Sequence, residues 1–491
     1  MSHVLVTGAT GYVGGRVVPQ LLNAGHDVTV FVRSPWKIRD VPWRPRVRVI
    51  VGDLDDAQAT REAVTGIDVA LYLVHSMTAG GDFAAAEAHA AATFADSAAA
   101  AGVTRIVYLG GLHPQTTSLS KHLASRVAVG NIFLTSPVPT IALQAGIIIG
   151  SGSASFEMIR HLTEVLPYMP APRWVRNRVQ PIAIRDVLRY LVAAVALPDE
   201  LNRTFDIGGP DVLRYGQMMN GYALEAGLPQ RPIAALPVFT PWLASQWVNV
   251  VTPVPRQIAV PIIASLQHDC IVTESDIERY IPPPQEGLLS YRTAVNLALI
   301  REAGGMVETS WQSATVNGAP SDPLPTDPEW SGRTVFTDVR TRESTASSPA
   351  VWQVIESIGG HNGWYSFPLA WAARGAIDRL AGGVGMRRGR RHPERVNAGD
   401  VIDVWRVESV ERGRMLRLRA EMRMPGRGWL ELSVESTADG SRYRQRAVYF
   451  PRGLAGRLYW LVLYPFHGII FGGMAVSIVR AAENPAQTPS G

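Results

Sequence analysis

The chain has 491 residues, of which 46% are apolar, and a formal net charge of +5. This length exceeds the size at which a single hydrophobic core stops growing, so we expect at least two domains, and no long polar tract indicates disorder. The single cysteine, Cys270, excludes an internal disulfide and fits a reducing compartment, and we interpret it as a small buried hydrophobe rather than a reactive thiol.

Arginine supplies almost all of the positive charge, since only Lys37 and Lys121 among the 47 basic residues are lysines. Together with the abundant alanine, this use of arginine suggests a GC-rich genome. We therefore do not interpret the positive net charge as a sign of a nucleic-acid partner. No RNA-binding or zinc-finger spacing occurs, and we expect neither nucleic-acid binding nor a metal site. The strand-like opening VLVTG, with no charged segment before an apolar one, predicts a cytoplasmic protein.

Short apolar runs alternate with helix-length segments from residue 4 to about 210. Their continuous Val/Ile/Leu character is typical of strands that are buried on both faces of a parallel sheet. The predicted strands are VLVTG (4–8), DVTVFVR (27–33), VRVIVGD (47–53), VALYLV (69–74), RIVYLGG (105–111) and TIALQAG (140–146). The alternation predicts an α/β, Rossmann-like doubly wound sheet.

The strongest chemical signal is VTGATGYVGG, residues 6–15, which places Gly8, Gly11 and Gly14 between the first strand and a helix. Glycines at these places allow a tight turn, close approach of the backbone to a pyrophosphate, and helix–strand packing, while the helix N-terminus offers free N–H groups. We therefore predict a dinucleotide site. Its predicted binding residues are Gly8, Thr10, Gly11, Tyr12, Val13, Gly14, Arg33, Asp53, Leu54, Val74 and His75.

The second strand ends at Arg33 and carries no acid there. An acid would accept from the adenosine ribose, whereas an arginine suits a 2′-phosphate, so NADP(H) is favoured over NAD(H). Arg33 as a solvated surface residue is the alternative. Asp53 either accepts from the adenine amino group or caps the helix that starts near residue 55.

Domain boundaries are predicted from changes in pattern. Residues 211–305 are predicted to be mostly helical, and APSDPLPTDPEWSG, within 319–332, is the best linker because it is rich in proline and aperiodic. We expect a nucleotide-binding domain over 1–230, its helical extension over 231–318, and a second domain over 333–483.

The second domain is predicted to be α+β. Alternating apolar and polar residues with turns between them indicate an antiparallel sheet with one wet face. The predicted strands are 334–342, 400–410, 413–424, 428–436 and 441–450, and the predicted helices are 348–358, 367–382 and 455–482.

The first 230 residues resemble the atypical, NmrA-like branch of the extended short-chain dehydrogenase/reductase family. The resemblance rests on TGATGYVGG, GDLDD, the HLASR region, and QPIAIRDVLRYLVAA followed by TFDIGGPDVLRYGQMM. LYLVHSM (71–77) and GSGSASFEMIRHL (150–162) are similar to bacterial proteins whose second domain is grouped with the START-like (SRPBCC) helix-grip folds. This resemblance implies an apolar cavity in the second domain and a lipophilic ligand.

HLASR, residues 122–126, occupies the place of the family's Tyr-x-x-x-Lys pair, with His122 and Arg126 at the reactive positions. Histidine can exchange protons near neutrality, whereas arginine can bind ribose or phosphate but cannot relay a proton. His122 is therefore a candidate acid/base, and a binding or packing role for the pair is the alternative. His75 and Ser76, after the fourth strand, are further candidate polar contacts of the nicotinamide.

Three features of the second domain leave more than one interpretation open. Its aromatic residues, Trp352, Trp364, Trp371, Trp405, Trp429 and Trp460, are interpreted as core rather than as a ligand box. The uncharged run 458–479 is long enough to cross a bilayer, but we favour a grip helix buried along the sheet and keep peripheral membrane contact open. The basic stretch 386–395 is interpreted as a solvated loop, with anionic headgroups or a phosphate as the alternative partner.

These observations favour an NADP(H)-dependent oxidoreductase acting on a hydrophobic carbonyl, enone or quinone. A non-catalytic NADP(H) sensor or assembly protein is the first alternative, because the Tyr and Lys are missing. The second alternative is a lipid-binding carrier whose nucleotide-binding domain serves only as a scaffold.

Overall fold

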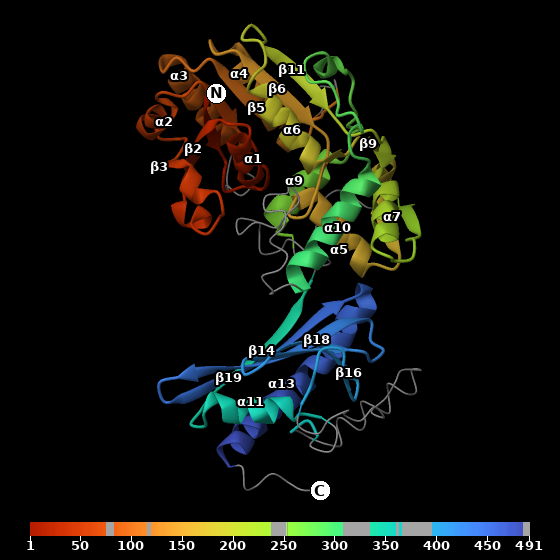
Figure 1. Cartoon of the computed structure of the whole chain (residues 1–491). Coiled ribbons are helices and arrows are strands. Elements are labelled where there is room, and N and C mark those ends of the chain that lie inside the picture. The colour runs from red at the N-terminus through yellow and green to blue at the C-terminus, as the bar shows by residue number, and fades with distance from the viewer. Residues whose placement is uncertain are drawn as a thin grey trace. The chain divides into compact units, whose positions relative to one another are not determined.

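The computed structural model describes residues 1–74, 83–114, 119–236, 252, 254–307, 334–359, 363–365 and 395–484. The chain forms two compact units, Met1–Gly332 and Arg333–Gly491 (Figure 1). The predicted linker 319–332 and the predicted helix 367–382 lie outside the described residues, as does the basic stretch 386–395 apart from Arg395.

The first unit is built on a seven-stranded sheet in the order β11-β6-β5-β4-β1-β2-β3. Every neighbouring pair is parallel. The strands are β1 (His3–Thr7), β2 (Asp27–Val32), β3 (Arg48–Val51), β4 (Val69–Tyr72), β5 (Arg105–Gly111), β6 (Thr140–Ala145) and β11 (Arg203–Ile207). The order reverses between β1 and β4, which is the point where ligands bind in doubly wound sheets.

Helices cover both faces of this sheet because alternate residues of each strand point to opposite sides. On one face, Val4 and Val6 of β1 pack with α1 (Tyr12–Asn23) and α6 (Ile184–Ala194). On the other, Leu5 packs with α2 (Ala57–Val64), α3 (Phe83–Ala100) and α4 (Lys121–Thr135). The predicted doubly wound α/β class is confirmed.

A second layer of the first unit has its own apolar core, formed mainly by α5, α7, α9 and α10. Its helices are α5 (Ala154–Val165), α7 (Tyr215–Glu225), α9 (Arg256–Ser265) and α10 (Tyr291–Val307). The short strands are β7 (Ile148–Ile149), β8 (Met169–Pro172), β9 (Arg178–Val179), β10 (Ile182–Ala183), β12 (Leu213–Arg214) and β13 (Ile233–Leu236). The prediction of a mostly helical 211–305 missed β12, β13 and the irregular chain between α9 and α10.

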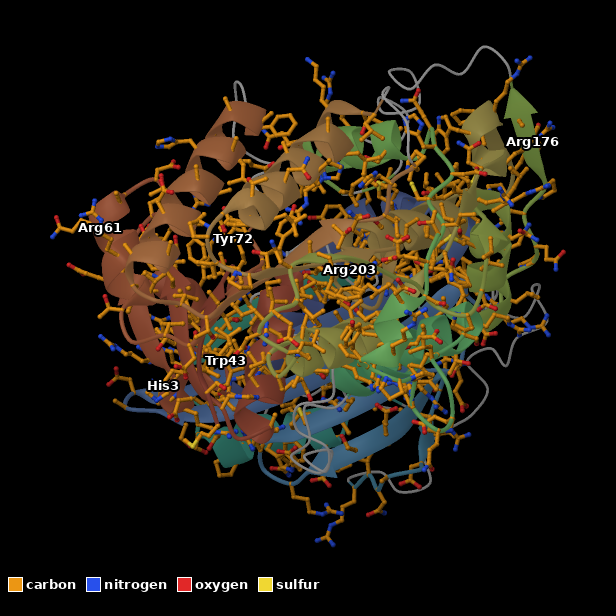
Figure 2. The ribbon with its side chains drawn as sticks, turned by 90° about the horizontal axis from the view of Figure 1, so that it is seen from above. His3, Trp43, Arg61, Tyr72, Arg176 and Arg203 are labelled. Atoms are coloured by element: carbon orange, nitrogen blue, oxygen red, sulfur yellow. The ribbon has the colours of Figure 1, made fainter. Side chains whose placement is uncertain are left out.

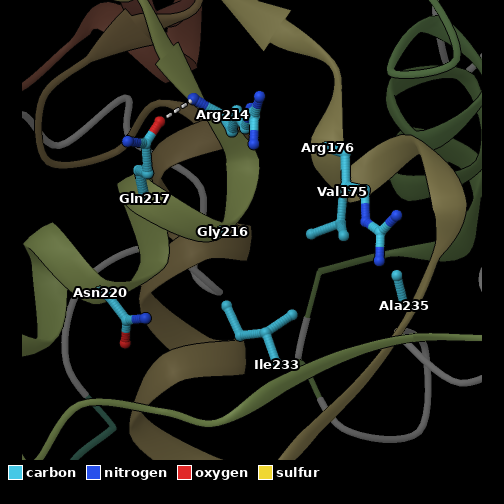
Figure 3. Close-up of a pocket in the computed structure, with 8 residues that line it drawn as sticks. All are labelled: Val175, Arg176, Arg214, Gly216, Gln217, Asn220, Ile233 and Ala235. Carbon is cyan, nitrogen blue, oxygen red and sulfur yellow. Dashed lines mark hydrogen bonds between the residues drawn. The ribbon is translucent and has the colours of Figure 1, made fainter.

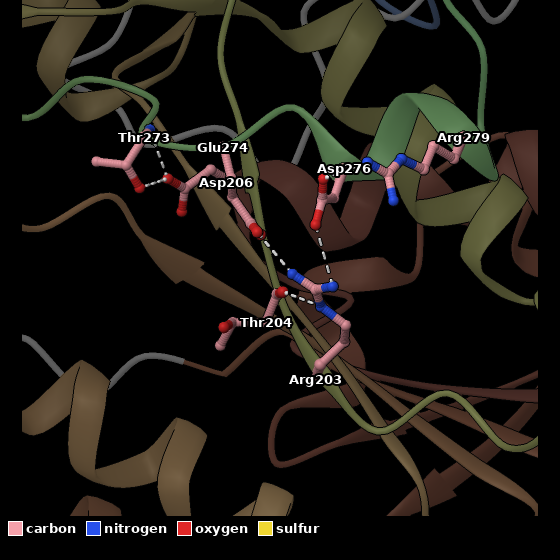
Figure 4. Close-up of polar contacts among 7 residues, drawn as sticks. All are labelled: Arg203, Thr204, Asp206, Thr273, Glu274, Asp276 and Arg279. Carbon is pink, nitrogen blue, oxygen red and sulfur yellow. Dashed lines mark hydrogen bonds and ion pairs between the residues drawn. The ribbon is translucent and has the colours of Figure 1, made fainter.

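The edge strand β11 is tied to a segment some 70 residues further along the chain (Figure 4). Arg203 donates to Glu274 Oε2 at 2.6 Å and to Asp276 Oδ2 at 3.2 Å. Asp206 accepts from both the backbone N–H and the hydroxyl of Thr273, at 2.9 and 2.7 Å. These side-chain contacts hold the segment against the edge strand of the sheet.

The second unit holds a six-stranded antiparallel sheet in the order β14-β19-β18-β17-β16-β15. The strands are β14 (Phe336–Ser344), β15 (Val401–Ile402), β16 (Trp405–Glu411), β17 (Met415–Ala420), β18 (Gly426–Thr437) and β19 (Gly440–Pro451), with helices α11 (Ser348–Glu356) and α13 (Gly453–Glu483). An antiparallel sheet with a long C-terminal helix confirms the predicted α+β, helix-grip class. The single strand predicted over 400–410 was wrong, because the backbone turns at Asp403 with φ of +51° and splits it into β15 and β16.

Side chains from the sheet, α11 and the second half of α13 fill the core of this unit. Five of the tryptophans that the sequence singled out, Trp352, Trp364, Trp405, Trp429 and Trp460, are buried, as a core role requires, and Trp371 lies outside the described residues. Three indole N–H groups donate to carboxylates: Trp352 to Glu356, Trp364 to Asp403, and Trp429 to Glu408.

The two halves of α13 have different surroundings. In the second half, Met474, Ala475 and Ile478 are fully buried in the core, whereas the first half exposes several large apolar side chains. Within the described part of the chain, α13 is the one helix whose length and apolar composition would allow it to cross a membrane. The expectation of a helix buried along the sheet therefore holds for its second half alone.

Candidate functional site

The glycine-rich loop joins β1 to α1 at the switch point of the sheet. Gly8 has a φ of +74°, a left-handed conformation that favours glycine, and the N–H of Gly11 donates to the carbonyl of Gly8 at 2.9 Å. A Cβ on Gly14 would lie 2.1 Å from the Gly8 carbonyl oxygen. The helix can therefore approach the loop this closely only because residue 14 lacks a side chain.

The N-terminus of α1 is open to an anion. No side chain among the described residues caps it, its N-cap is Gly11, and its first turn holds no acid. The first-turn amides of a helix have no partner within the helix and carry part of the positive end of the helix dipole. With Thr10, Tyr12 and Val13 half-buried around it, this loop fits a dinucleotide pyrophosphate.

Two buried side chains hold α1 in this position. Trp43, labelled in Figure 2, donates its indole N–H to the Gly15 carbonyl at 3.0 Å. Arg16 lies over the Tyr12 ring and donates to the Ser151 carbonyl at 3.3 Å, which joins the helix to the loop before α5. The site is thus anchored to both layers of the first unit.

Arg33 and Asp53, predicted for the adenosine end, lie together at the carboxyl ends of β2 and β3. Their closest charged atoms are 3.7 Å apart, and 70% of the Arg33 side chain is exposed. The helix-capping alternative for Asp53 was wrong, because Asp56 caps α2 by accepting from the backbone N–H groups of Gln58 and Ala59. Leu54 is buried in the core that includes α2 and α3, so its side chain packs inward, and a contact with the cofactor stays a prediction.

Arg126 bridges the ends of β4 and β5, where the nicotinamide end is predicted. Its guanidinium donates to the carbonyls of Val74 and Leu109 and lies 4.9 Å from the centre of the Tyr108 ring. The Tyr108 hydroxyl donates back to the Arg126 carbonyl at 3.0 Å. These contacts show that Arg126 packs between the two strand ends, and its role in binding a cofactor stays a prediction.

His122 lies on the same helix, one turn before Arg126, and contacts α9 instead. Its Nδ1 lies 2.9 Å from the hydroxyl oxygen of Ser265. Because Ser265 donates its own proton to the Pro261 carbonyl at 3.0 Å, this geometry favours a proton on Nδ1 of His122. This contact holds the ring in one orientation, and the proton-exchange role of His122 stays a prediction.

A buried hydrogen bond between Ser125, the neighbour of Arg126 in the chain, and Glu87 was not predicted from the sequence. Ser125 donates to the Glu87 carboxylate of α3 at 2.5 Å, and both side chains are buried. Burial raises the pKa of Tyr108 to about 12, although the Arg126 charge opposes this rise, and burial raises the pKa of Tyr72 as well. The sequence feature that could have indicated this contact is Glu87 itself, because it is the single acidic residue in the first half of the alanine-rich segment 83–101.

Two residues predicted for the nicotinamide end, His75 and Ser76, lie outside the described residues. Among the described residues, the predicted site residues form three local groups. These are the glycine loop, the pair Arg33 and Asp53, and the pair Val74 and Arg126. His113, two residues after β5, follows the same carboxyl edge of the sheet.

A pocket of about 270 Å³ lies in the second layer of the first unit, beside the start of α7 (Figure 3). Arg176 and Arg214 line it together with apolar side chains such as Val175 and Ile233. Its lining includes none of the described residues that were predicted to bind the cofactor or to exchange protons. It is thus separate from the glycine loop.

The comparisons with families match each unit separately. Residues 8–128 match the family described as NAD(P)H-binding, and residues 330–474 match one described as a protein of unknown function (DUF2867). Part of the first unit is thus similar to an NAD(P)H-binding family, and most of the second unit is similar to the DUF2867 family.

Curated relatives match parts of the first unit. A 3-beta-hydroxysteroid dehydrogenase of Mycolicibacterium neoaurum is 40% identical over 68 residues, which is 14% of this chain and 18% of the relative. A ceramide reductase of Caulobacter vibrioides is 28% identical over 202 residues, which is 40% of this chain and 61% of the relative. The chain thus spans less than a fifth of the first of these proteins and less than two thirds of the second.

Among solved structures, the triphenylmethane reductase of a Citrobacter species in complex with NADP(H) is 19% identical, with a TM-score of 0.48. The match covers 60% of this chain and 99% of that one. A UDP-glucose 4-epimerase of Bifidobacterium longum with NAD⁺ and UDP is 14% identical, with a TM-score of 0.48, over 62% of this chain and 98% of that one.

Proposed function

We propose that the chain is an NADP(H)-dependent oxidoreductase that acts on a hydrophobic carbonyl, enone or quinone. The observation that carries the proposal is the uncapped N-terminus of α1 behind the Gly8–Gly14 loop at the sheet's switch point. The names of two partial relatives, a steroid dehydrogenase and a ceramide reductase, support an apolar substrate class.

In this proposal the described residues divide the binding of the cofactor among them. The first-turn amides of α1 hold the pyrophosphate, and the exposed Arg33 guanidinium holds a 2′-phosphate. Asp53, 3.7 Å from Arg33, keeps that guanidinium at the rim of the site and is the proposed acceptor for the adenine amino group. Arg126 fixes the strand ends around Val74, where the nicotinamide ring would lie.

The bound nicotinamide supplies a hydride, and the chain's own residues then manage the proton. His122, oriented by Ser265, is the proposed acid that protonates the substrate oxygen during reduction and the base in the reverse direction. Arg126 is a positioning residue, because it cannot lose a proton and its guanidinium binds backbone carbonyls.

Arg33→Asp is expected to weaken NADPH binding by about 10- to 100-fold, since a hydrogen bond to a charged group contributes about 1.5–3 kcal/mol. NADH affinity should change less, because NADH has no 2′-phosphate. Titration of nicotinamide fluorescence with both nucleotides measures this. Arg39→Asp makes the same charge change at an exposed arginine nearby and should leave both affinities within about twofold, well under one kcal/mol. Equal losses for NADPH and NADH in Arg33→Asp would contradict a 2′-phosphate contact.

His122→Ala is expected to lower turnover of a reducible quinone or enone by about 100-fold or more, as loss of a general acid does. NADPH affinity should stay unchanged, because His122 contacts α9 rather than the glycine loop. Steady-state NADPH oxidation and nucleotide titration measure the two effects separately. His89→Ala, at an exposed histidine of α3, is the control. Full turnover in His122→Ala would remove His122 from the reaction while leaving cofactor binding intact.

A further inference from the structure

The first half of α13 carries a continuous apolar surface that faces solvent. Its members are exposed by between 38% and 70%: Leu454, Leu458, Leu461, Val462, Tyr464, Phe466 and Ile469. Most recur three or four residues apart, which places them on one side of a helix. We call these seven residues the α13 apolar face. Soluble proteins rarely expose so many large apolar side chains together unless the surface binds something.

The direction of this face is fixed by stacking on the opposite side of the helix. The Trp460 ring stacks on Phe336 of β14 at 5.3 Å and on Tyr449 of β19 at 5.6 Å, with the planes within 9° of parallel. Gly456 lets the start of the helix lie close to the chain, since a Cβ there would be 2.4 Å from the Pro425 carbonyl oxygen. The helix therefore cannot turn its apolar face inward without breaking these contacts.

Charge in the second unit points to a negatively charged partner. Residues 333–491 hold 23 arginines against 14 acidic residues, a net charge of +9, whereas residues 1–332 carry 24 basic and 28 acidic residues. Arg452 and Arg457 stand at the start of α13, and no acidic residue, lysine or arginine follows from Leu458 to Val479. An uncharged apolar stripe that starts beside arginines, in a strongly basic domain, is typical of helices that lie in an anionic membrane surface.

We propose that the α13 apolar face docks onto an anionic phospholipid bilayer and lies in its interfacial region. The helix does not span in this arrangement, because Met474, Ala475 and Ile478 in its second half are fully buried in the domain core. A second copy of the chain is the less favourable occupant, since it would bring another domain of charge +9 against the first. Docking is independent of the proposed oxidoreductase activity.

The test is sedimentation of the full chain with vesicles of phosphatidylcholine, alone or mixed with phosphatidylglycerol. We expect binding to the mixed vesicles, weaker binding to phosphatidylcholine alone, and release at high salt, which screens headgroup charge. Leu461→Glu combined with Phe466→Glu should lower binding at least about tenfold, because two charges would enter the apolar layer. The control, Tyr168→Glu with Val212→Glu, adds the same charges at exposed apolar residues of the first unit and should bind as the parent does.

Thermal unfolding and light scattering accompany the vesicle assay. The α13 variant should unfold like the parent, since the altered side chains are exposed. Equal vesicle binding by parent and α13 variant overturns the proposal. The proposal is also overturned if the parent binds no vesicles. If the parent is then found to be a dimer and the α13 variant a monomer, the α13 apolar face binds a second copy of the chain.

Discussion

Gly14→Ala is expected to lower the affinity for NADPH and NADH alike, by about 100-fold or more, which corresponds to roughly 2.8 kcal/mol. The added Cβ would lie 2.1 Å from the Gly8 carbonyl oxygen and 2.6 Å from its carbonyl carbon. Both atoms belong to the backbone, so no side chain can move aside, and the loop must shift away from the helix. The amides that would hold the pyrophosphate move with it. Fluorescence titration measures the affinity.

A matched control separates this effect from a general cost of alanine in a helix. Gly472 of α13 has no heavy atom within 4 Å of a built Cβ, so Gly472→Ala should leave nucleotide affinity unchanged and stabilise the helix slightly. Gly14→Ala should still unfold cooperatively, although overpacking costs about 1–3 kcal/mol. Parent-like nucleotide binding by a folded Gly14→Ala would show that the loop does not hold the cofactor.

Glu157→Leu is expected to destabilise the first unit by about 3–5 kcal/mol, the usual cost of breaking a buried ion pair from one side. Glu157, Arg160 and His161 of α5 are all buried. The Glu157 carboxylate lies 3.5 Å from Arg160 Nη1 and 3.7 Å from His161 Nε2, and it accepts from the Gly152 N–H at 2.8 Å. Leucine removes the negative charge from beside these groups. Urea denaturation measures the change.

Glu62→Leu makes the same substitution at an exposed site on α2 and should change stability by no more than about 0.5 kcal/mol. If Glu157→Leu does not fold, Glu157→Gln keeps an acceptor for Gly152 and should show a smaller loss in the same direction. Glu157 also anchors the loop whose Ser151 carbonyl binds Arg16 of α1, so the Gln variant should bind NADPH more weakly. Parent-like unfolding of both variants would contradict a stabilising role for this carboxylate.

The strands of the seven-stranded sheet differ in how easily they can be predicted from the sequence. Five of the six predicted strands are largely buried and appear as mostly apolar runs, whereas the edge strand β3 is only partly buried. The seventh, β11, was not predicted as a strand because Arg203 and Asp206 interrupt it, and these polar residues turn toward Glu274, Asp276 and Thr273. Likewise, 400–410 has the pattern of one strand, and only the left-handed backbone at Asp403 reveals a hairpin.

The candidate site was predictable where neighbours in sequence are neighbours in space. The glycine spacing gave the loop, and the ends of consecutive strands gave Arg33 and Asp53. The contacts of Ser125 with Glu87 and of His122 with Ser265 join residues 38 and 143 positions apart. A single sequence holds no signal for such pairs, because helix packing rather than spacing brings them together. The difference in burial between the two halves of α13 could not be predicted for the same reason, because the helix is mostly apolar along its whole length.

The tie between β11 and residues 273–279 affects how the first unit can be produced. Ile277 and Ile281 belong to the same apolar core as Val4 and Val6, although about 270 positions of chain separate them. A nascent chain released only as far as residue 230 would therefore leave that core unfilled and its outermost strand bare. Expression of the nucleotide-binding part alone should thus extend through α10, and during translation this core can be completed only after residue 281 has left the ribosome.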